Sequence, residues 1–404
     1  MNSVIINLQA LRRNFEVIVG MMRDQGASWS VVTKALCGHE ETIKALHMLG
    51  ARSVADSRLD NLRTIKQSVP TLEKWYLRLP HLSVVEDVVA LSDVSLNSEI
   101  EIIRALGKEA ARQGKTHSIV IMIELGDLRE GILPGTLVKF YKGIFDLPNI
   151  QVLGIGAQIG CLAGAVPSVD QVAQLLLYRE LLELKFNHKL PLISAGSSIF
   201  LPLLQEASLP RGMNHYRIGE ALFLGTDLVH GGTLKGLRDD VILLEAEIAE
   251  IKQKSLVTLG ETVHSQPFEP TVSDGDESQP MMPGQRGYRA LVTVGQIDTD
   301  VAGLTPVNPA HQIAGASSDI TVVNLGDDPG GLGIGDTITF KPNYSAFVRL
   351  MNDSYIAKKI TPSLDEFATM LPDAMRISVP PAMDDVRRNG DGGPGAGNRT
   401  AGDV

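Results

Sequence analysis

One lysine ends a run of strand-forming residues, at a place where α/β folds carry reactive groups. The stretch from Ser30 to His39 reads SVVTKALCGH, and β-forming residues run from Trp29 to Thr33, directly before Lys34. Partial burial frees the amine of a lysine, so a lysine in this place can form a Schiff base with an aldehyde cofactor. A lysine that ends a strand is also commonly a solvated surface residue, so the rest of the chain has to decide between the two.

Three further strand ends or turns carry groups that bind anions. Arg129, in the stretch ELGDLREG, offers a planar fork that suits a carboxylate. Ser194 begins the stretch SAGSS, whose small residues let backbone N–H groups approach a phosphate. Arg217, in the stretch YRIGEA, ends another apolar run, and a buried arginine needs a partner. A surface arginine and a plain Gly/Ser turn are the alternatives for the first two.

Eight β-rich runs alternate with amphipathic helical patterns over roughly the first 230 residues. The expected strands are Trp29–Lys34, Arg52–Asp56, Trp75–Leu79, Asp93–Leu96, Ser118–Leu125, Val152–Gln158, Pro191–Ala195 and Tyr216–Ala221. Eight consecutive β-then-α units predict a closed (β/α)8 TIM barrel, which would bring the four strand ends above to one site. An open, doubly wound sheet is the competing interpretation.

Helices of this barrel have identifiable patterns and starts. Apolar residues at helical spacing predict a helix from Leu8 to Met22, before the first strand. Ser98 with Glu101, and Ser168 with Gln171, have the spacing of capping boxes at two further helix starts.

The pattern changes near Leu234, where alternation with a period of two begins. Further strands are expected at Tyr288–Val294, Asp319–Leu325 and Thr337–Lys341, with a long polar loop from Gly260 to Gly287. We therefore predict an α/β fold with a barrel domain at residues 1–233 and a smaller, all-β C-terminal domain at 234–371. The remainder, 372–404, lacks apolar periodicity and is expected to be a disordered tail.

Composition excludes several classes of protein. The chain has 404 residues, and its net charge of −10, without a basic stripe, argues against a nucleic-acid surface. No apolar run is long enough to span a membrane, and the first residues do not form a signal peptide. Cys37 and Cys161 form no disulfide framework, so we expect a cytoplasmic protein. Cys37 and His39 lie close together in the sequence, but no second Cys/His pair has ligand spacing, so no metal is expected.

Several motifs in one order resemble the alanine racemase family, the pyridoxal phosphate (PLP) barrel class, and within it the ornithine racemase-like branch. The resemblance extends over roughly residues 4–360. It rests on VVTKALCG, ADSRLDNL, LRLPHLSVVEDV, DVSLNSE, ELGDLREGI, ISAGSS, HYRIGEALFLG, VGQIDTDVAGLTP, GASSD and KPNYSAFVRLM.

The resemblance implies a PLP-binding barrel with assigned cofactor residues. Lys34 is expected to be the Schiff-base lysine and the proton carrier on one face of Cα. Arg217 is expected beside the pyridine nitrogen; because arginine stays protonated, it leaves that nitrogen neutral, which favours rapid reprotonation and hence racemisation. Ser194, Gly219 and Tyr344 fall at phosphate-holding positions. The resemblance also implies a head-to-tail homodimer, in which the second domain completes the site of the neighbouring subunit.

The substrate residues depart from the family pattern. Arg129 aligns with the arginine near the substrate carboxylate, but Gln296 stands where alanine racemases place a tyrosine as the second base. Glutamine cannot exchange protons near neutral pH. Asp298, Asp300 or Cys37 could be that base; Asp298 and Asp300 could instead hold the distal ammonium of ornithine or lysine. The family's histidine in the sixth-strand turn corresponds to Gln158.

These features predict a PLP-dependent racemase of an amino acid, with a basic one such as ornithine favoured. A lyase or aldolase on the same scaffold is one alternative; aldolases of this group usually need a metal. A non-catalytic PLP-binding homeostasis protein is the other, but such proteins are single barrels, which the second domain argues against.

Overall fold

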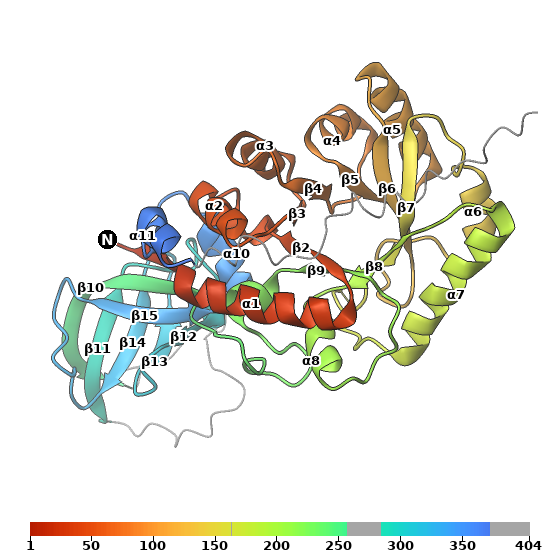
Figure 1. The fold of residues 1–404 in the computed structure, drawn as a ribbon. Helices are drawn as coiled ribbons and strands as arrows, with labels where there is room; N and C mark the ends of the chain where they lie inside the picture. The colour runs from red at the N-terminus through yellow and green to blue at the C-terminus, as the bar shows by residue number, and fades with distance from the viewer. Residues whose placement is uncertain (163, 257–283, 372–404) are drawn as a thin grey trace, which may run out of the picture.

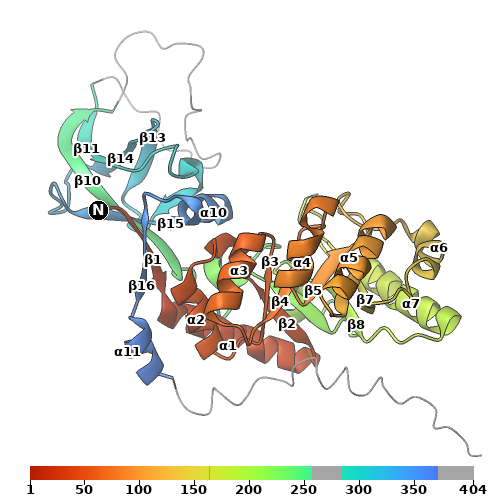
Figure 2. The same ribbon diagram turned by 90° about the horizontal axis from the view of Figure 1, so that it is seen from above.

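The computed structural model describes residues 1–162, 164–256 and 284–371, and these form two lobes. Figure 1 shows a barrel with surrounding helices on one side and a β-rich lobe on the other; Figure 2 shows the same two lobes from above. The predicted tail at 372–404 and residues 260–283 of the predicted loop lie outside the described residues.

The larger lobe is a closed barrel of eight parallel strands in chain order, so the predicted (β/α)8 fold is confirmed and the open sheet is wrong. Each predicted strand overlaps an observed one. These are β2 (Ser28–Val32), β3 (Ser53–Asp56), β4 (Glu73–Tyr76), β5 (Val94–Asn97), β6 (His117–Ile123), β7 (Ile150–Ala157), β8 (Leu192–Gly196) and β9 (His215–Ile218).

Helices follow each strand of the barrel and pack their apolar faces against it. They are α2 (Glu40–Met48), α3 (Leu59–Ser68), α4 (Val85–Leu91), α5 (Ile100–Arg112), α6 (Leu137–Lys142), α7 (Val169–Phe186), α8 (Phe200–Gln205) and α9 (Glu220–Leu224), with the short 3-10 turns η1 (Lys34–Leu36), η2 (Leu82–Val84) and η3 (Pro134–Thr136).

Helix starts were predicted correctly in two of three cases. Helix α1 (Leu8–Gln25) confirms the first helical pattern and is capped by the side chain of Asn7. The box formed by Ser168 and Gln171 caps α7 as expected. The box at Ser98 is wrong: α5 starts later, at Ile100, after Glu99, whose side chain makes no capping bond.

Side chains fill the barrel interior, so the residues that could take part in chemistry lie at its mouth. Trp75 lies in a cluster of apolar barrel residues and stacks on the ring of His215, with centroids 4.3 Å apart. The wall is tight: a Cβ on Gly196 would lie 1.9 Å from the ring of Tyr216. A packed interior of this kind makes a TIM barrel a rigid support for its strand ends.

The smaller lobe is a sheet of antiparallel strands in the order β12-β15-β10-β11-β14-β13, to which β1 and β16 are attached. Its strands are β10 (Ile242–Ser255), β11 (Arg286–Val292), β12 (Leu304–Pro306), β13 (Gln312–Ala316), β14 (Thr321–Gly326), β15 (Thr337–Pro342), β16 (Ala357–Thr361) and β1 (Ser3–Asn7). The helix α10 (Tyr344–Asn352) and the turn η4 (Val301–Gly303) lie beside this sheet, whereas the helix α11 (Leu364–Thr369) packs against α2 of the barrel. The predicted all-β domain is confirmed, and β1, β12, β13 and β16 were not predicted.

The first strand ties the two lobes together. β1 precedes α1 but pairs antiparallel with β10 and parallel with β16. On α1, the buried Asn14 donates to the carbonyl oxygens of Leu222 and Arg238 and accepts the backbone N–H of Arg238. These bonds fix the segment just before β10 against α1, so the chain starts the smaller lobe's longest strand from a position held by the barrel.

Candidate active site

Lys34 lies at the carboxyl end of β2, in the turn η1, and is half-buried. Thr33, just before it, is anchored by a 2.8 Å hydrogen bond from its Oγ1 to the buried carboxylate of Asp56 on β3. The Nζ of Lys34 lies 5.8 Å from the centroid of the Tyr344 ring. Nζ makes no hydrogen bond or ion pair with any described residue, so the amine is available for chemistry.

Tyr344 reaches the barrel mouth from the smaller lobe of the same chain. It is the first residue of α10, whose start is capped by the side chain of Asn343 through a 3.0 Å bond to the N–H of Ala346. Burial raises the pKa of Tyr344, and the charge of Glu220 adds to that rise. The phenol therefore stays a neutral donor at the mouth.

Arg217 is the buried cation of the site and lies on β9. Its Nη1 donates to the backbone oxygen of Ser194 and, at 2.6 Å, to the Ser194 hydroxyl. Its Nη2 donates to the backbone oxygen of Ala157 at 3.0 Å and to Oε1 of Gln158 at 3.2 Å. Burial lowers its pKa to about 10, so the side chain keeps its charge at neutral pH.

Ser194 was expected to contact a phosphate, but in the structure its hydroxyl contacts protein groups. It is fully buried on β8, and its Oγ accepts from Arg217 and lies 2.8 Å from Nδ1 of His215. The other ring nitrogen of His215 lies 3.0 Å from Oγ of Ser30. Burial lowers the pKa of His215 to about 3, so the ring is neutral. In this structure, Ser194 positions Arg217 from beneath.

A small cradle lies at the ends of β8 and β9. The Oγ of Ser198 accepts the backbone N–H of Ala221 at 3.2 Å, at the start of α9. Gly219, the residue that precedes α9, has no room for a side chain, because a Cβ would lie 2.9 Å from that of Val32. Hydroxyl and backbone N–H groups gathered at a helix start suit an anion such as a phosphate.

Arg129 lies in the loop after β6 and already has two partners. Its Nε and Nη2 pair with the carboxylate of Glu130, and its Nη1 donates to Sγ of Cys161 at 2.8 Å. Burial acts to raise the pKa of Glu130, but the hydrogen bonds and charge of Arg129 outweigh it, and the net pKa is lowered. Guanidinium has five N–H donors, so two remain for a substrate carboxylate.

The segment that carries Gln296, Asp298 and Asp300 forms a tight turn in the smaller lobe. Oδ2 of Asp298 accepts the N–H of Gly295 at 2.8 Å, and Asp300 precedes η4. Burial raises the pKa of Asp298, and the nearby charges of Asp353 and Asp319 raise it further.

This turn is also fixed to the helix that carries Tyr344. Oγ1 of the buried Thr299 donates to the carbonyl oxygen of Ala346 at 3.1 Å. Among the described residues of one chain, no hydrogen bond or ion pair joins Asp298 or Asp300 to Lys34, Arg129 or Arg217. The structure thus brings the barrel residues and Tyr344 together, and holds the two aspartates in the neighbouring turn.

Three residues at the mouth had no role in the sequence analysis. Cys161 was noted only as a cysteine without a disulfide partner, and Ser198 and Glu220 only as letters of longer motifs. Burial raises the pKa of Glu220, and the charge of Lys34 opposes that rise. Each follows a barrel strand by two to four residues, so its position after a strand was the available signal.

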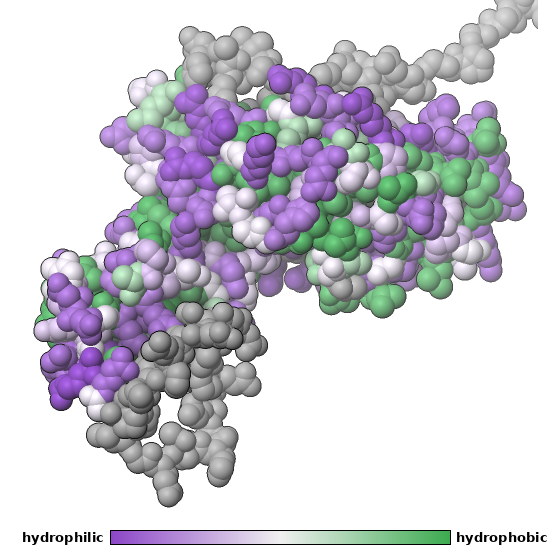
Figure 3. All heavy atoms as spheres, turned by 90° about the horizontal axis from the view of Figure 1, so that it is seen from below, coloured by the Kyte–Doolittle hydropathy of each residue, from purple (hydrophilic) through white to green (hydrophobic). Residues whose placement is uncertain are grey.

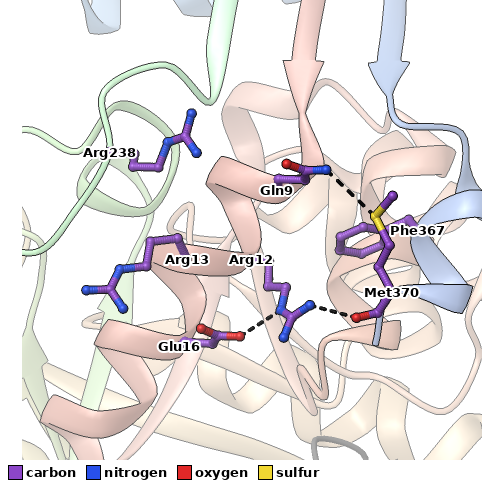
Figure 4. Close-up of a pocket in the computed structure, with 7 residues that line it drawn as sticks. All are labelled: Gln9, Arg12, Arg13, Glu16, Arg238, Phe367 and Met370. Atoms are coloured by element: carbon purple, nitrogen blue, oxygen red, sulfur yellow. Dashed lines mark hydrogen bonds and ion pairs between the residues drawn. The ribbon is translucent and has the colours of Figure 1, made fainter. Parts of the chain in front are cut away.

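A separate pocket lies on the outside of the barrel, beside α1 and α11 (Figure 4). Its arginines are engaged: Arg12 with Glu16 and the backbone oxygen of Met370, Arg13 with that of Gly236. It contains none of the predicted site residues.

Within the described ranges, no group of three or more His, Cys, Asp or Glu side chains could hold a metal ion. The helices of the same ranges include none that is long and apolar enough to cross a membrane.

Comparison with known proteins agrees with this geometry. The family described as "Alanine racemase, N-terminal domain" matches residues 6–227. The chain is 34% identical over 359 residues to an ornithine racemase of Acetoanaerobium sticklandii, covering 88% of this chain and 99% of that protein. It is 29% identical to a lysine racemase of Thermotoga maritima over 363 residues, 89% of this chain and 99% of that one.

Solved structures show the same fold. An alanine racemase of Streptomyces coelicolor A3(2) superposes with a TM-score of 0.66 at 18% identity, over 90% of this chain and 98% of that one. At this identity the likeness establishes the two-lobed fold. Together with the family match over more than half of the chain, it confirms the resemblance seen in the motifs: the chain belongs to the alanine racemase family.

Proposed function

We propose that this chain racemises a basic amino acid, with ornithine favoured. Membership of the family makes it a PLP-dependent amino-acid racemase, as the sequence predicts. The observation that carries the substrate proposal is the similarity to an ornithine racemase along almost the whole of both chains, with a lysine racemase as a second relative.

The residues at the barrel mouth fit the cofactor. We assign the Schiff base to Lys34, whose Nζ has no other partner among the described residues. Ser198, Gly219 and Tyr344 would hold the phosphate, and Ser194 would act indirectly, by holding Arg217 beside the ring nitrogen. PLP supplies the electron sink that makes the α-proton of an amino acid removable.

Arg217 sets how that sink behaves. Its burial and four hydrogen bonds hold a charged guanidinium in one place. A cation at this position would leave the pyridine nitrogen unprotonated. The return of a proton to Cα would then be fast, which would favour racemisation over transamination.

Substrate binding uses the two ends of the amino acid. Arg129 keeps two N–H groups for the α-carboxylate, which places Cα near Lys34, and Lys34 would carry the proton on one face. Asp298 and Asp300 would hold the distal ammonium of ornithine. The pKa of Asp298 is raised by burial and by two neighbouring aspartates, and an ammonium ion would relieve that repulsion. The sequence-based alternative, Asp298 as second base, stays a prediction.

These aspartates would act on the neighbouring subunit in a head-to-tail homodimer. Leu128 and Leu162, which adjoin Arg129 and Cys161 at the mouth, are exposed, as is Ile297 in the aspartate turn. Exposed apolar side chains on both surfaces support their burial against a partner. Figure 3 shows further hydrophobic areas on the larger lobe. Leu177 and Leu184 of α7 are also exposed. Cys37 and Cys161 are unpaired, which supports the proposed cytoplasmic location.

A screen of single enantiomers tests the proposed function. With PLP present, we expect L-ornithine and L-lysine to lose optical rotation fastest and L-alanine more slowly. Retained rotation for every amino acid, with cofactor bound, would contradict a racemase. A preference for alanine would leave the racemase and overturn the proposed role of the two aspartates.

A further inference from the structure

Cys161 lies at the barrel mouth in a fixed position. It follows β7, and its Sγ accepts from Nη1 of Arg129 at 2.8 Å. Oδ1 of Asp127 accepts the backbone N–H groups of Cys161 and Leu162 at 2.9 and 3.0 Å. The loop is therefore held by a buried carboxylate, and the thiol is held against the arginine that would bind the substrate carboxylate.

The surroundings of Cys161 are those of the active site. Burial dominates the pKa of Arg217, which is lowered to about 10, and the charge of a Cys161 thiolate acts on it in the opposite direction. Burial likewise raises the pKa of Tyr344, and the same thiolate charge adds to that rise. Cys161 is thus within electrostatic reach of both cofactor residues and in contact with Arg129.

Barrel order places Cys161 across the mouth from Lys34. Lys34 follows β2 and Cys161 follows β7; β8 and β9 stand between them on one side and β3 to β6 on the other. In an amino acid, Cα is bonded directly to the carboxylate carbon. A base must approach Cα within about 3 Å, so a second base has to lie next to the carboxylate-binding arginine, where Cys161 is.

The other candidates are less well placed. Gln296 cannot exchange protons near neutral pH. Asp298 is engaged in its own turn by the N–H of Gly295. Cys37 ends the same turn as Lys34, on the side of the lysine, and burial raises the pKa of its thiol.

We propose that Cys161 is the second proton-transfer residue, acting on the face of Cα opposite Lys34; this rests on the proposed role of Lys34. In one direction the Cys161 thiolate takes the α-proton: an S–H bond forms, the Cα–H bond breaks, and the electron pair stays on the substrate. The Lys34 ammonium then gives its proton to the opposite face. In the reverse direction the two residues exchange roles, and exchange with water restores their protonation states between turnovers.

Cys161→Ser and Cys37→Ser are a matched pair of variants, because the chain has two cysteines. In deuterated water, C161S should lose exchange of the α-proton of one ornithine enantiomer by about a hundredfold or more, the range of general acid–base catalysis. Exchange of the other enantiomer should persist, and C37S should retain both. Unchanged exchange in C161S, equal loss for both enantiomers, or the one-sided loss in C37S would each overturn the proposal.

A chemical footprint supplies a readout other than activity. Iodoacetamide should alkylate Cys161 in the PLP-bound wild-type protein, and added ornithine should slow that modification while leaving Cys37 unaffected, as measured by peptide mass mapping. Modification of Cys161 at the same rate with and without ornithine would show that the thiol lies outside the substrate site. Failure of the Lys34 assignment is recognised separately, since borohydride would then leave no cofactor adduct on Lys34.

Discussion

The barrel mouth and the smaller lobe contribute to one site in different ways. On the barrel side, Lys34, Arg129 and Arg217 each follow or end a parallel strand. Thr33, next to Lys34, is bonded to Asp56 on β3, and Arg217 is bonded to Ser194 on β8. On the lobe side, Tyr344 reaches Lys34 within one chain, whereas Asp298 and Asp300 lie in an adjoining turn without contact to it. The barrel therefore holds most of the residues proposed for the chemistry, and the lobe supplies Tyr344 and, in our proposal, the residues that select the substrate of a partner subunit.

The largest expected effect comes from the barrel side. Arg217→Glu should reduce racemisation by about a hundredfold or more, the scale seen when one electrostatic partner of a reacting group is lost. A carboxylate there would let the ring nitrogen take a proton, so a new long-wavelength absorbance band or transamination should appear. Arg217→Lys, which keeps the charge, is the control. Unchanged rates and spectra in R217E would mean that Arg217 does not face the ring.

The sequence alone predicted which residues lie on the barrel side of the site, and the reason is physical. Parallel strands of a barrel are short apolar runs at regular spacing, and their carboxyl ends all meet at one mouth. Counting the strands was therefore enough to predict that Lys34, Arg129 and Arg217 lie at the same mouth. What the pattern could not give was the direction of each side chain: Ser194 points to Arg217 and His215, and Ser198 takes the place at the start of α9.

The next largest effect is expected on PLP binding, at the two residues that would hold the phosphate, one from the lobe and one from the barrel. Tyr344→Phe in the lobe and Ser198→Ala in the barrel should each weaken PLP binding to the apoprotein by about tenfold or more, since a hydrogen bond to a charged group is worth about 1.5–3 kcal/mol. Titration of apoprotein with PLP, followed by absorbance, measures this. If S198A binds weakly and Y344F normally, the lobe does not hold the cofactor within its own chain.

The lobe was less predictable because its contacts are distant in sequence. β1 at the amino terminus pairs with β10 and with β16, more than 230 residues away. The short strands β12 and β13 have weak alternation. Cys161 was missed because a single cysteine has no periodic signal, and its meaning depends on a contact with Arg129 across two loops.

A smaller effect is expected for the aspartates of the lobe. Asp298→Asn and Asp300→Asn should each raise KM for ornithine about tenfold in both directions and spare alanine, because one charged partner of the ammonium is lost. Steady-state kinetics with both enantiomers checks this. Impairment in one enantiomeric direction alone would make the aspartate a base and count against Cys161. No change in either variant would show that this turn lies outside the active site.

A separate effect, on stability and not on catalysis, concerns the residues that support Arg217. The pKa of His215 is lowered to about 3 by burial, below its usual 6.5. The unfolded chain therefore binds more protons between these values, and stability should fall as the pH drops from 6.5 towards 3, by on the order of 5 kcal/mol at most for this residue. His215→Gln should have a lower Tm at neutral pH but a shallower loss of Tm on acidification. An equally steep loss would show that His215 is not buried as a neutral ring.

The most direct test of the central claim is the position of the cofactor bond. Purified protein should carry an absorbance band near 420 nm (a family expectation), and borohydride should fix the cofactor to one peptide. Tryptic mapping by mass spectrometry is expected to find that adduct on Lys34, and Lys34→Ala should yield neither adduct nor racemisation. An adduct on any other lysine, or turnover by K34A, would contradict the site described above.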